Sequence, residues 1–165
     1  LRRGLSVALA AVVLVVLAGC GGSASSARAR TRTLTLEQAV PNLTNIDTNV
    51  NGSLGDQLVF EAPVTRNGKP FGAVYGELTN AATAPQARDT TAEERLSLVV
   101  FDLPGGQISV FGGSYYLPGQ RELEPKRDVA RAIIGGTGKY LGADGEVVTT
   151  RLPDGTYTHV IRLVG

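Results

Sequence analysis

The segment "DVARAIIGGTGKYLGADGEV" (residues 128–147) decides the fold, and its run of glycines first raises the question of a nucleotide site. A phosphate-binding loop requires a glycine five residues before its Gly-Lys pair and a serine or threonine directly after it. Here Ile133 occupies the first position and Tyr140 the second. The segment therefore does not bind phosphate in this way, and its glycines must have another use.

The rest of the chain has the periodicity of β-strands. Short apolar or alternating runs, separated by turn residues, occupy residues 33–40, 56–65, 70–79, 94–103, 107–117, 127–136, 145–152 and 156–165. Glycine-containing turns follow or precede them at Asn67-Gly68, Pro104-Gly105-Gly106, Pro118-Gly119 and Pro153-Asp154-Gly155. Polar stretches at residues 41–55 and 80–94 are expected to be loops. Eight short strands at hairpin spacing predict an all-β antiparallel barrel or sandwich, because closure removes exposed edges.

The first residues have the pattern of an export signal. Two arginines precede an apolar stretch and small residues, and the stretch ends in Leu17-Ala18-Gly19-Cys20. This ending resembles the bacterial lipobox, in which the cysteine thiol receives a lipid; an ordinary signal peptide with a chance cysteine is the alternative. We expect a signal peptide at 1–19, a lipidated tether at 20–33 and one barrel domain at 34–165. The expected location is the outer face of a bacterial cell membrane, with Cys20 as the lipid anchor.

Composition excludes several classes of site. The chain has one cysteine and one histidine, so no metal-ligand cluster can be assembled from local motifs and no metal is expected. The net charge is +1 and aromatic residues make up 5%, which leaves no basic, aromatic-rich surface for nucleic acid. A serine triad would have to use His159 and lacks a nucleophile elbow. No cofactor motif is found, and none is expected.

Three segments carry a resemblance to a known superfamily. "GDQLVF" at residues 55–60, "GQISVFGG" at 106–113 and the segment at 128–147 together resemble the allene oxide cyclase and dirigent protein superfamily. The resemblance implies an eight-stranded antiparallel β-barrel with a hydrophobic cavity, assembled as a trimer. It also implies that Gly135, Gly136 and Gly138 turn the chain out of one strand, that Gly142 and Gly145 lead it into the next, and that Tyr140 packs between them.

The catalytic residues of that superfamily do not carry over. The family glutamate corresponds to Glu37, but Ala39 stands where the family has asparagine, and Pro41 comes too early. Asp144 replaces an arginine that dirigent proteins commonly have, and Lys139 replaces an acidic residue. Neither known chemistry is supported residue by residue. An acid–base pair of Lys139 with Asp144 is conceivable, with a surface salt bridge as the alternative.

The alternation of side chains along the strands indicates the candidate site residues. Val59 and Glu61 share a face of one strand, Tyr75 and Glu77 share a face of the next, and His159 lies in the last strand. If these faces line the barrel, Glu61, Glu77 and His159 are candidate catalytic residues, and Tyr75, Glu61 and Val59 contact the ligand. Burial would then raise the pKa of Glu61 into the range useful for proton transfer. If they face water, they are ordinary exposed positions.

The sequence predicts a barrel that binds a small apolar or aromatic molecule and leaves its use open. The alternatives are a cofactor-free isomerase or cyclase that orients its substrate, and a structural envelope protein with a filled barrel. A cavity of a few hundred Å³ with converging polar groups favours the enzyme, an apolar cavity favours binding, and a packed core favours the structural protein. Apolar runs such as "LSLVVF" leave both strand faces apolar, so we also expect a homo-oligomer.

Overall fold

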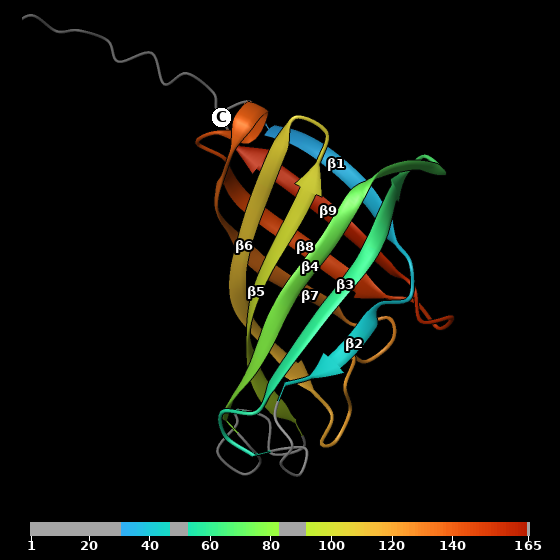
Figure 1. Cartoon of the computed structure of the whole chain (residues 1–165), viewed down its shortest axis with the longest axis vertical. Coiled ribbons are helices and arrows are strands. Elements are labelled where there is room, and N and C mark those ends of the chain that lie inside the picture. The colour runs from blue at the N-terminus through green and yellow to red at the C-terminus, as the bar shows by residue number, and fades with distance from the viewer. Residues whose placement is uncertain (1–30, 47–52, 83–91, 165) are drawn as a thin grey trace, which may run out of the picture.

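The computed structural model describes residues 31–46, 53–82 and 92–164, which form a barrel of antiparallel strands (Figure 1). The strands are β1 (Thr31–Gln38), β2 (Asn42–Asn45), β3 (Gln57–Arg66), β4 (Lys69–Ala82), β5 (Glu93–Leu103), β6 (Gly106–Tyr116), β7 (Asp128–Gly136), β8 (Asp144–Arg151) and β9 (Tyr157–Val164). A short 3-10 helix, η1 (Gly138–Tyr140), connects β7 to β8. No helix in the described part of the chain is long and apolar enough to cross a membrane.

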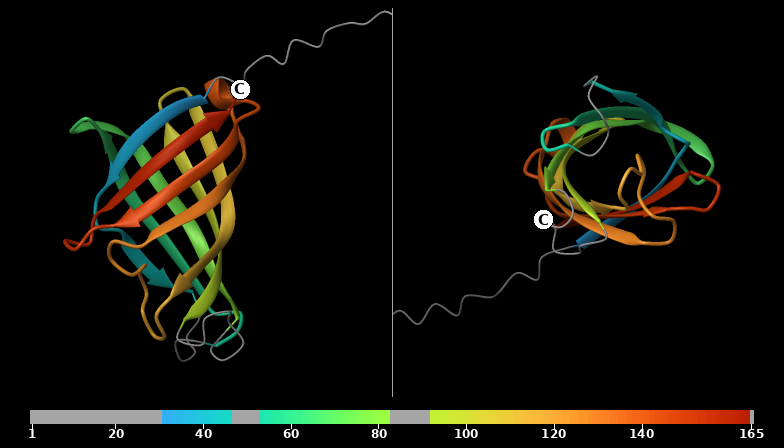
Figure 2. Two further views of the ribbon diagram at one scale, coloured as in Figure 1. Left: turned by 180° about the vertical axis from the view of Figure 1, so that it is seen from behind. Right: turned by 90° about the horizontal axis from the view of Figure 1, so that it is seen from below.

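The sheet closes on itself. Its strands follow the order β1-β9-β8-β7-β6-β5-β4-β3-β2, and β1 also pairs with β3 through Glu37 opposite Thr65 and Gln38 opposite Val64. β2 continues beside the other half of β3, so β1 and β2 together occupy one position of the ring. The end-on view in Figure 2 shows the closed ring. The predicted eight-stranded antiparallel barrel is confirmed.

The strand boundaries differ from the predicted ones in three places. β2 lies within residues 41–55, which were expected to be a loop, and β4 and β5 extend into the second expected loop at 80–94. β1 begins at Thr31, so the last three residues of the expected tether belong to the barrel. The expected signal peptide, Cys20 and the rest of the tether lie outside the described residues, as do residues 47–52 and 83–91.

Apolar side chains fill the barrel from both ends. One cluster lies toward the end that carries the β3–β4 and β5–β6 turns and η1; it is built around Leu36, Val74, Phe101 and Ile161. A second cluster lies toward the opposite end and consists of Leu58, Leu78, Tyr116, Leu123, Val129 and Tyr157. Leu123 comes from the β6–β7 loop (residues 117–127) rather than from a strand. The interior is therefore closed by side chains at one end and by a loop at the other.

The glycines of the 128–147 segment serve backbone geometry, as expected. Gly138 has φ +58°, and its added Cβ would lie 2.1 Å from the carbonyl oxygen of Gly105. The Lys139 N–H donates to that carbonyl at 2.8 Å, so η1 packs directly against the β5–β6 turn. A side chain at residue 138 would separate these two backbones. The glycine run thus holds the closed end of the barrel together.

We expect Gly138→Ala to destabilise the protein more than Gly142→Ala. Gly142 also has a positive φ, +75°, but nothing lies within 4 Å of its added Cβ. Both substitutions carry the cost of a left-handed backbone, about 1 to 2 kcal/mol, and only Gly138→Ala adds a backbone clash. Urea unfolding of the two variants measures the difference. Equal losses of unfolding free energy would contradict the close-approach explanation.

Candidate functional site

An interior cavity of about 50 Å³ lies between the two apolar clusters. Its walls come from most strands of the ring and from the β6–β7 loop. The lining residues are Gln38, Pro41, Leu43, Phe60, Leu78, Val99, Phe101, Val110, Tyr116, Arg121, Glu122, Leu123, Arg131, Val147, Thr149, Tyr157 and His159. Most are apolar, and the polar members at the strand positions form a band across the interior. The volume is enough for a few water molecules, since one needs about 10 to 15 Å³.

Arg131 is the buried cation of this polar band. It lies on β7 between the inward residues Val129 and Ile133, and only 8% of it is exposed. Its Nε donates to Ser114 Oγ at 3.0 Å, and its Nη2 donates to the same oxygen. Gly112 leaves room for its stem, because a Cβ there would lie 3.2 Å from Arg131 Cγ. Burial lowers the pKa of the guanidinium, yet arginine stays protonated at neutral pH.

His159 belongs to a satisfied hydrogen-bond chain beside Arg131. Its Nε2 lies 2.8 Å from Gln38 Oε1, and its Nδ1 lies 3.0 Å from Thr149 Oγ1. A carbonyl oxygen only accepts, so Nε2–H donates to Gln38, and Nδ1 accepts from the Thr149 hydroxyl. Burial, and then the Arg131 charge, lower the pKa of His159 to about 3. The imidazole is therefore neutral at physiological pH, with both nitrogens occupied.

Two tyrosines add hydroxyl groups near the cavity. Burial raises the pKa of Tyr116, although the charges of Arg131 and Arg95 oppose that rise. Burial also raises the pKa of Tyr157, and the neighbouring Glu122 carboxylate adds to the effect. The Tyr157 hydroxyl donates to Glu122 Oε1 at 3.3 Å. Both side chains are neutral phenols at neutral pH, so neither supplies a negative charge to the interior.

The β6–β7 loop closes the mouth of the barrel. It reaches over the open end of the ring in the end-on view of Figure 2. Leu123, 4% exposed, points inward, and Glu122 forms an ion pair of 2.9 Å with Arg151 on β8. Arg121 donates to the Leu43 carbonyl at 2.8 Å, which ties the loop to β2. The loop residues Arg121, Glu122 and Leu123 therefore form the part of the cavity lining nearest the mouth.

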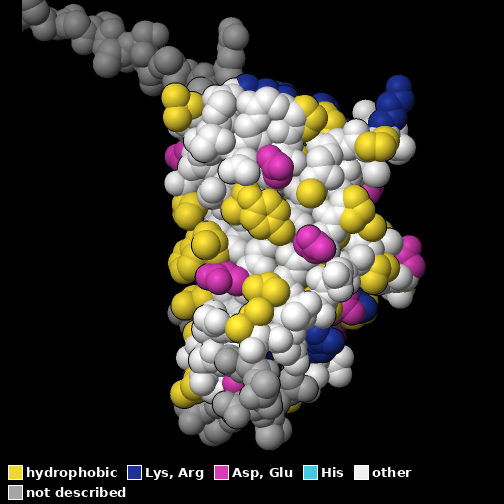
Figure 3. All heavy atoms as spheres, in the orientation of Figure 1, with side chains coloured by type: hydrophobic (Ala, Val, Ile, Leu, Met, Phe, Trp, Pro, Cys, Tyr) yellow, Lys and Arg dark blue, Asp and Glu magenta, His cyan; other side chains and the backbone are white. Residues whose placement is uncertain are grey.

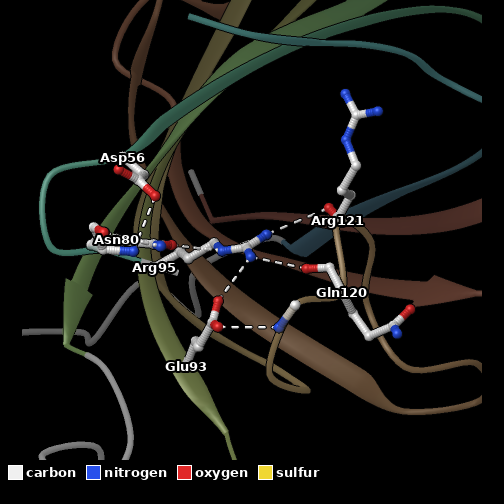
Figure 4. Close-up of polar contacts among 8 residues, drawn as sticks. Asp56, Asn80, Glu93, Arg95, Gln120 and Arg121 are labelled. Carbon is white, nitrogen blue, oxygen red and sulfur yellow. Dashed lines mark hydrogen bonds and ion pairs between the residues drawn. The ribbon is translucent and has the colours of Figure 1, made fainter. Parts of the chain in front are cut away.

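Arg95 anchors the same loop from the wall of the barrel (Figure 4). Its guanidinium forms a 2.9 Å ion pair with Glu93, donates to Asn80 Oδ1 at 2.7 Å, and donates to the Gln120 carbonyl at 2.8 Å. Glu93 in turn accepts from the Gly119 N–H at 3.1 Å. Fully paired in this way, Arg95 positions the loop and has little capacity left for a ligand.

The candidate residues Val59, Glu61, Tyr75 and Glu77 are brought together, but on the outer wall. The prediction that they line the barrel interior is wrong. They border an open hollow of about 550 Å³ on β2, β3, β4 and β5, and Tyr75 is 41% exposed. Figure 3 shows hydrophobic and acidic side chains interleaved on this face. The reason is that Leu58 and its alternate neighbours on β3 form the more apolar face, which turns inward.

His159 is the one predicted catalytic candidate that lies inside, and it is separated from the outer-wall group by the sheet. Whether any of these residues takes part in chemistry stays a prediction. No ion pair joins Lys139 to Asp144: the Lys139 ammonium lies over the Tyr140 ring at 5.1 Å, and Asp144 accepts from the Gly145 N–H at 2.7 Å. Within the described residues, no cluster of three or more histidine, cysteine or acidic side chains could hold a metal.

The sequence analysis missed Arg131, Gln38 and Thr149. The signal for Arg131 was present, since strict alternation in "DVARAII" places it on the same face as Val129 and Ile133. An arginine between two inward apolar residues is unusual, because charged side chains are almost never fully buried without a partner. Gln38 and Thr149 are also buried on inward strand faces, but an uncharged polar side chain at such a position is a weaker signal than an arginine.

Comparisons with known proteins find similar folds among solved structures but no match by sequence. No protein-family model and no curated protein matches the sequence. A solved pyocyanin demethylase superposes with a TM-score of 0.60 at 20% identity, covering 81% of this chain and 99% of its own. AbnU, an exo-specific intermolecular Diels-Alderase, gives 0.60 at 15%, covering 83% and 98%. The Diels-Alderase AbmU from Streptomyces koyangensis gives 0.62 at 17%, covering 86% and 72%.

This chain shares their barrel fold. At these identities the likeness extends to the fold alone, and it does not show an allene oxide cyclase or dirigent protein.

Because His159 is neutral and buried, we expect acid to destabilise the barrel. Its pKa of about 3 in the folded state lies below the ordinary value of 6.5, so the unfolded chain binds the extra proton first. The contribution of His159 to stability is complete only well above pH 6.5, is partly lost at pH 6.5 and falls further as the pH decreases. Between pH 6.5 and 5 this one group should remove about 1.6 kcal/mol of unfolding free energy.

Urea unfolding at a series of pH values measures this loss, with His159→Gln as the variant that should lack it. NMR of the single imidazole should show it neutral over the same range. A titration of His159 in the folded protein near pH 6.5 would contradict the assignment.

Proposed function

We propose that this protein binds a small apolar or aromatic molecule inside its barrel, beneath the β6–β7 loop. The observation that carries the proposal is the polar band of Gln38, Arg131, Thr149 and His159, which crosses an otherwise apolar interior. Apolar walls provide most of the binding free energy in such sites, and a few fixed polar groups set the orientation. The hydrogen bonds of His159 and Arg131 fix these groups before a ligand arrives.

The barrel's shape also suits a protein that steers a reaction without a cofactor. Holding a flexible molecule in one reactive conformer supplies much of the rate of a cyclisation. The solved barrels it resembles in fold include two named Diels-Alderases and a named demethylase of pyocyanin, an indication that this architecture accommodates reactions of small molecules. Orientation of a bound molecule by the polar band is therefore the mechanism that we propose for any catalysis here.

A second candidate is a structural protein with a filled barrel. The cavity volume of about 50 Å³ favours it, because ligand sites usually measure about 300 to 1,000 Å³. In the binding proposal the missing volume comes from the loop, whose Leu123 and Glu122 side chains occupy the mouth. The two candidates therefore differ in whether this loop can be displaced by a ligand.

Binding of N-phenyl-1-naphthylamine, a neutral aromatic dye whose fluorescence increases in apolar sites, tests the proposal. We expect the purified protein in detergent-free buffer to bind the dye, and Leu123→Ala to bind it several-fold more tightly, because the substitution enlarges the mouth of the cavity. Leu103→Ala is the matched control. It removes the same atoms from the other buried cluster, away from the cavity lining, and should leave the dye affinity unchanged.

NMR of His159, the single histidine, shows where the dye binds. Binding inside the barrel should shift the His159 imidazole resonances, whereas binding at the outer-wall hollow should not. If neither the wild type nor Leu123→Ala bound the dye at this site, the binding proposal would be contradicted. The structural protein with a filled barrel would then be the better candidate.

We further propose that the protein is exported and held at the outer face of a bacterial cell membrane by a lipid on Cys20. The support is the sequence Leu17-Ala18-Gly19-Cys20 at the end of an apolar stretch. The apolar outer wall, with Leu96 45% and Phe111 43% exposed, supports a homo-oligomer, a trimer by the resemblance; the mass in solution by light scattering tests it.

Replacing Cys20 with serine should abolish metabolic labelling with a radioactive fatty acid and move the protein from the detergent phase to the aqueous phase in a phase-separation assay. The reason is that the thiol is the acceptor of the lipid. Ser26→Ala, a substitution in the neighbouring sequence, is the control and should keep the label. Unchanged partitioning of the Cys20→Ser protein would rule out the anchor.

A further inference from the structure

Arg131 differs from the other buried and half-buried arginines at this end of the barrel in having no carboxylate partner. Arg95 pairs with Glu93 at 2.9 Å, and Arg151 pairs with Glu122 at 2.9 Å. The guanidinium of Arg131 donates to Ser114 Oγ and also interacts with the Tyr116 hydroxyl, and no carboxylate among the residues that the structure describes forms an ion pair with it. An unpaired buried ion costs several kcal/mol of desolvation. The interior therefore contains one positive charge that the described fold does not neutralise.

The surrounding groups hold the guanidinium in place without compensating it. Ser114 accepts two N–H groups of Arg131, so its own hydroxyl is free to donate to Ser97 Oγ, which lies 3.1 Å away. This buried chain fixes the plane of the fork through Nε and Nη2. The nearby phenol of Tyr116 is neutral, as is the imidazole of His159. The fork is oriented, but no carboxylate in the described part of the chain forms an ion pair with it.

The other charged residues of the cavity lining do not alter this balance. Glu122 is the acidic member, and Arg151 and the Tyr157 hydroxyl occupy its two oxygens. Arg121, the remaining charged member, is exposed and donates to the Leu43 carbonyl. The lining thus has an excess of positive charge centred on Arg131, which water in a 50 Å³ cavity can solvate only in part.

We propose that the ligand of this site carries an anionic oxygen, as a carboxylate, sulfonate or phenolate on an apolar or aromatic body, and that Arg131 binds that oxygen. The inference rests on the proposed function and specifies its ligand class. A guanidinium fork already fixed by Ser114 forms charge-assisted hydrogen bonds to an oxyanion at small entropic cost. The apolar body then lies against Phe101, Val99 and the displaced Leu123 side of the cavity.

Two dyes with one skeleton separate the charge from the apolar body. 8-Anilino-1-naphthalenesulfonate is N-phenyl-1-naphthylamine with an added sulfonate, so their two dissociation constants report the contribution of the anion. We expect Arg131→Met to raise the dissociation constant of the sulfonate dye at least about tenfold. The same substitution should change the dissociation constant of the neutral dye by less than about threefold. Arg131→Lys keeps the positive charge but loses the guanidinium fork. Its affinity for the sulfonate dye should therefore lie between those of the wild type and Arg131→Met.

Two controls assign the effect to this site. Leu98→Ser alters the outer-wall hollow, where Leu98 is 39% exposed, and should leave both interior affinities unchanged. The His159 imidazole resonances should shift with either dye, which places the binding inside the barrel. Circular dichroism confirms that each variant is folded.

The wild type alone supplies a second test if Arg131→Met does not fold. 1-Naphthoate and 1-naphthamide have nearly the same shape and differ in charge, and the His159 resonances report the binding of each. We expect the wild type to bind naphthoate at least about tenfold more tightly. Equal affinities, or a sulfonate dye unaffected by Arg131→Met, would overturn the inference while leaving the neutral-dye result, and with it the proposed function, intact. Absence of neutral-dye binding would instead overturn the proposed function itself.

Discussion

Pairing of β1 with β3 is the constraint on which the rest of the structure depends. It closes the sheet into a ring, so each of the eight ring positions has a neighbour on both sides, with β1 and the short β2 sharing one position beside β3. In a closed ring, alternation sends every second side chain into one confined space. Eight strands leave an interior that side chains just fill or that holds one small ligand. The polar band in this barrel is therefore confined among apolar clusters, where each unpaired group has a large energetic effect.

The strands and their closure were predictable because both depend on local signals. Alternating runs and glycine turns located all eight barrel strands, and the 128–147 segment indicated a strand, a glycine turn and a second strand. Close approach of η1 to the β5–β6 turn explains why glycine stands at residue 138. The short β2 was missed because "NLTN" has neither the length nor the alternation of the other strands. Its pairing with β3 is a tertiary contact that no local pattern indicates.

The inward face of each strand was less predictable, and the candidate site changed as a result. The sequence left open which of these faces line the barrel. On β9 the face with His159 lies inside, whereas on β3 and β4 the faces with Glu61 and Tyr75 lie outside. The physical criterion is comparative: on β3 the opposite face has Leu58, Phe60 and Ala62 and no charge. A search for acid–base groups selected the polar face, whereas burial selects the apolar one.

The polar band also distinguishes a binding barrel from a filled one on energetic grounds. Replacing a buried ion by a well-packed apolar side chain is often neutral or stabilising, so a barrel that served only as a scaffold would gain nothing from Arg131. A scaffold would gain nothing from a buried His159 either, because an imidazole that stays neutral in the folded state makes the fold sensitive to acid. Both residues lower the stability of an interior that apolar residues could fill. The mouth is closed by a loop held through ion pairs and carbonyl contacts, which exchange with water more readily than a packed core. A costly polar interior beneath a loop held in this way is the arrangement expected of a site that completes its charge balance when a ligand enters.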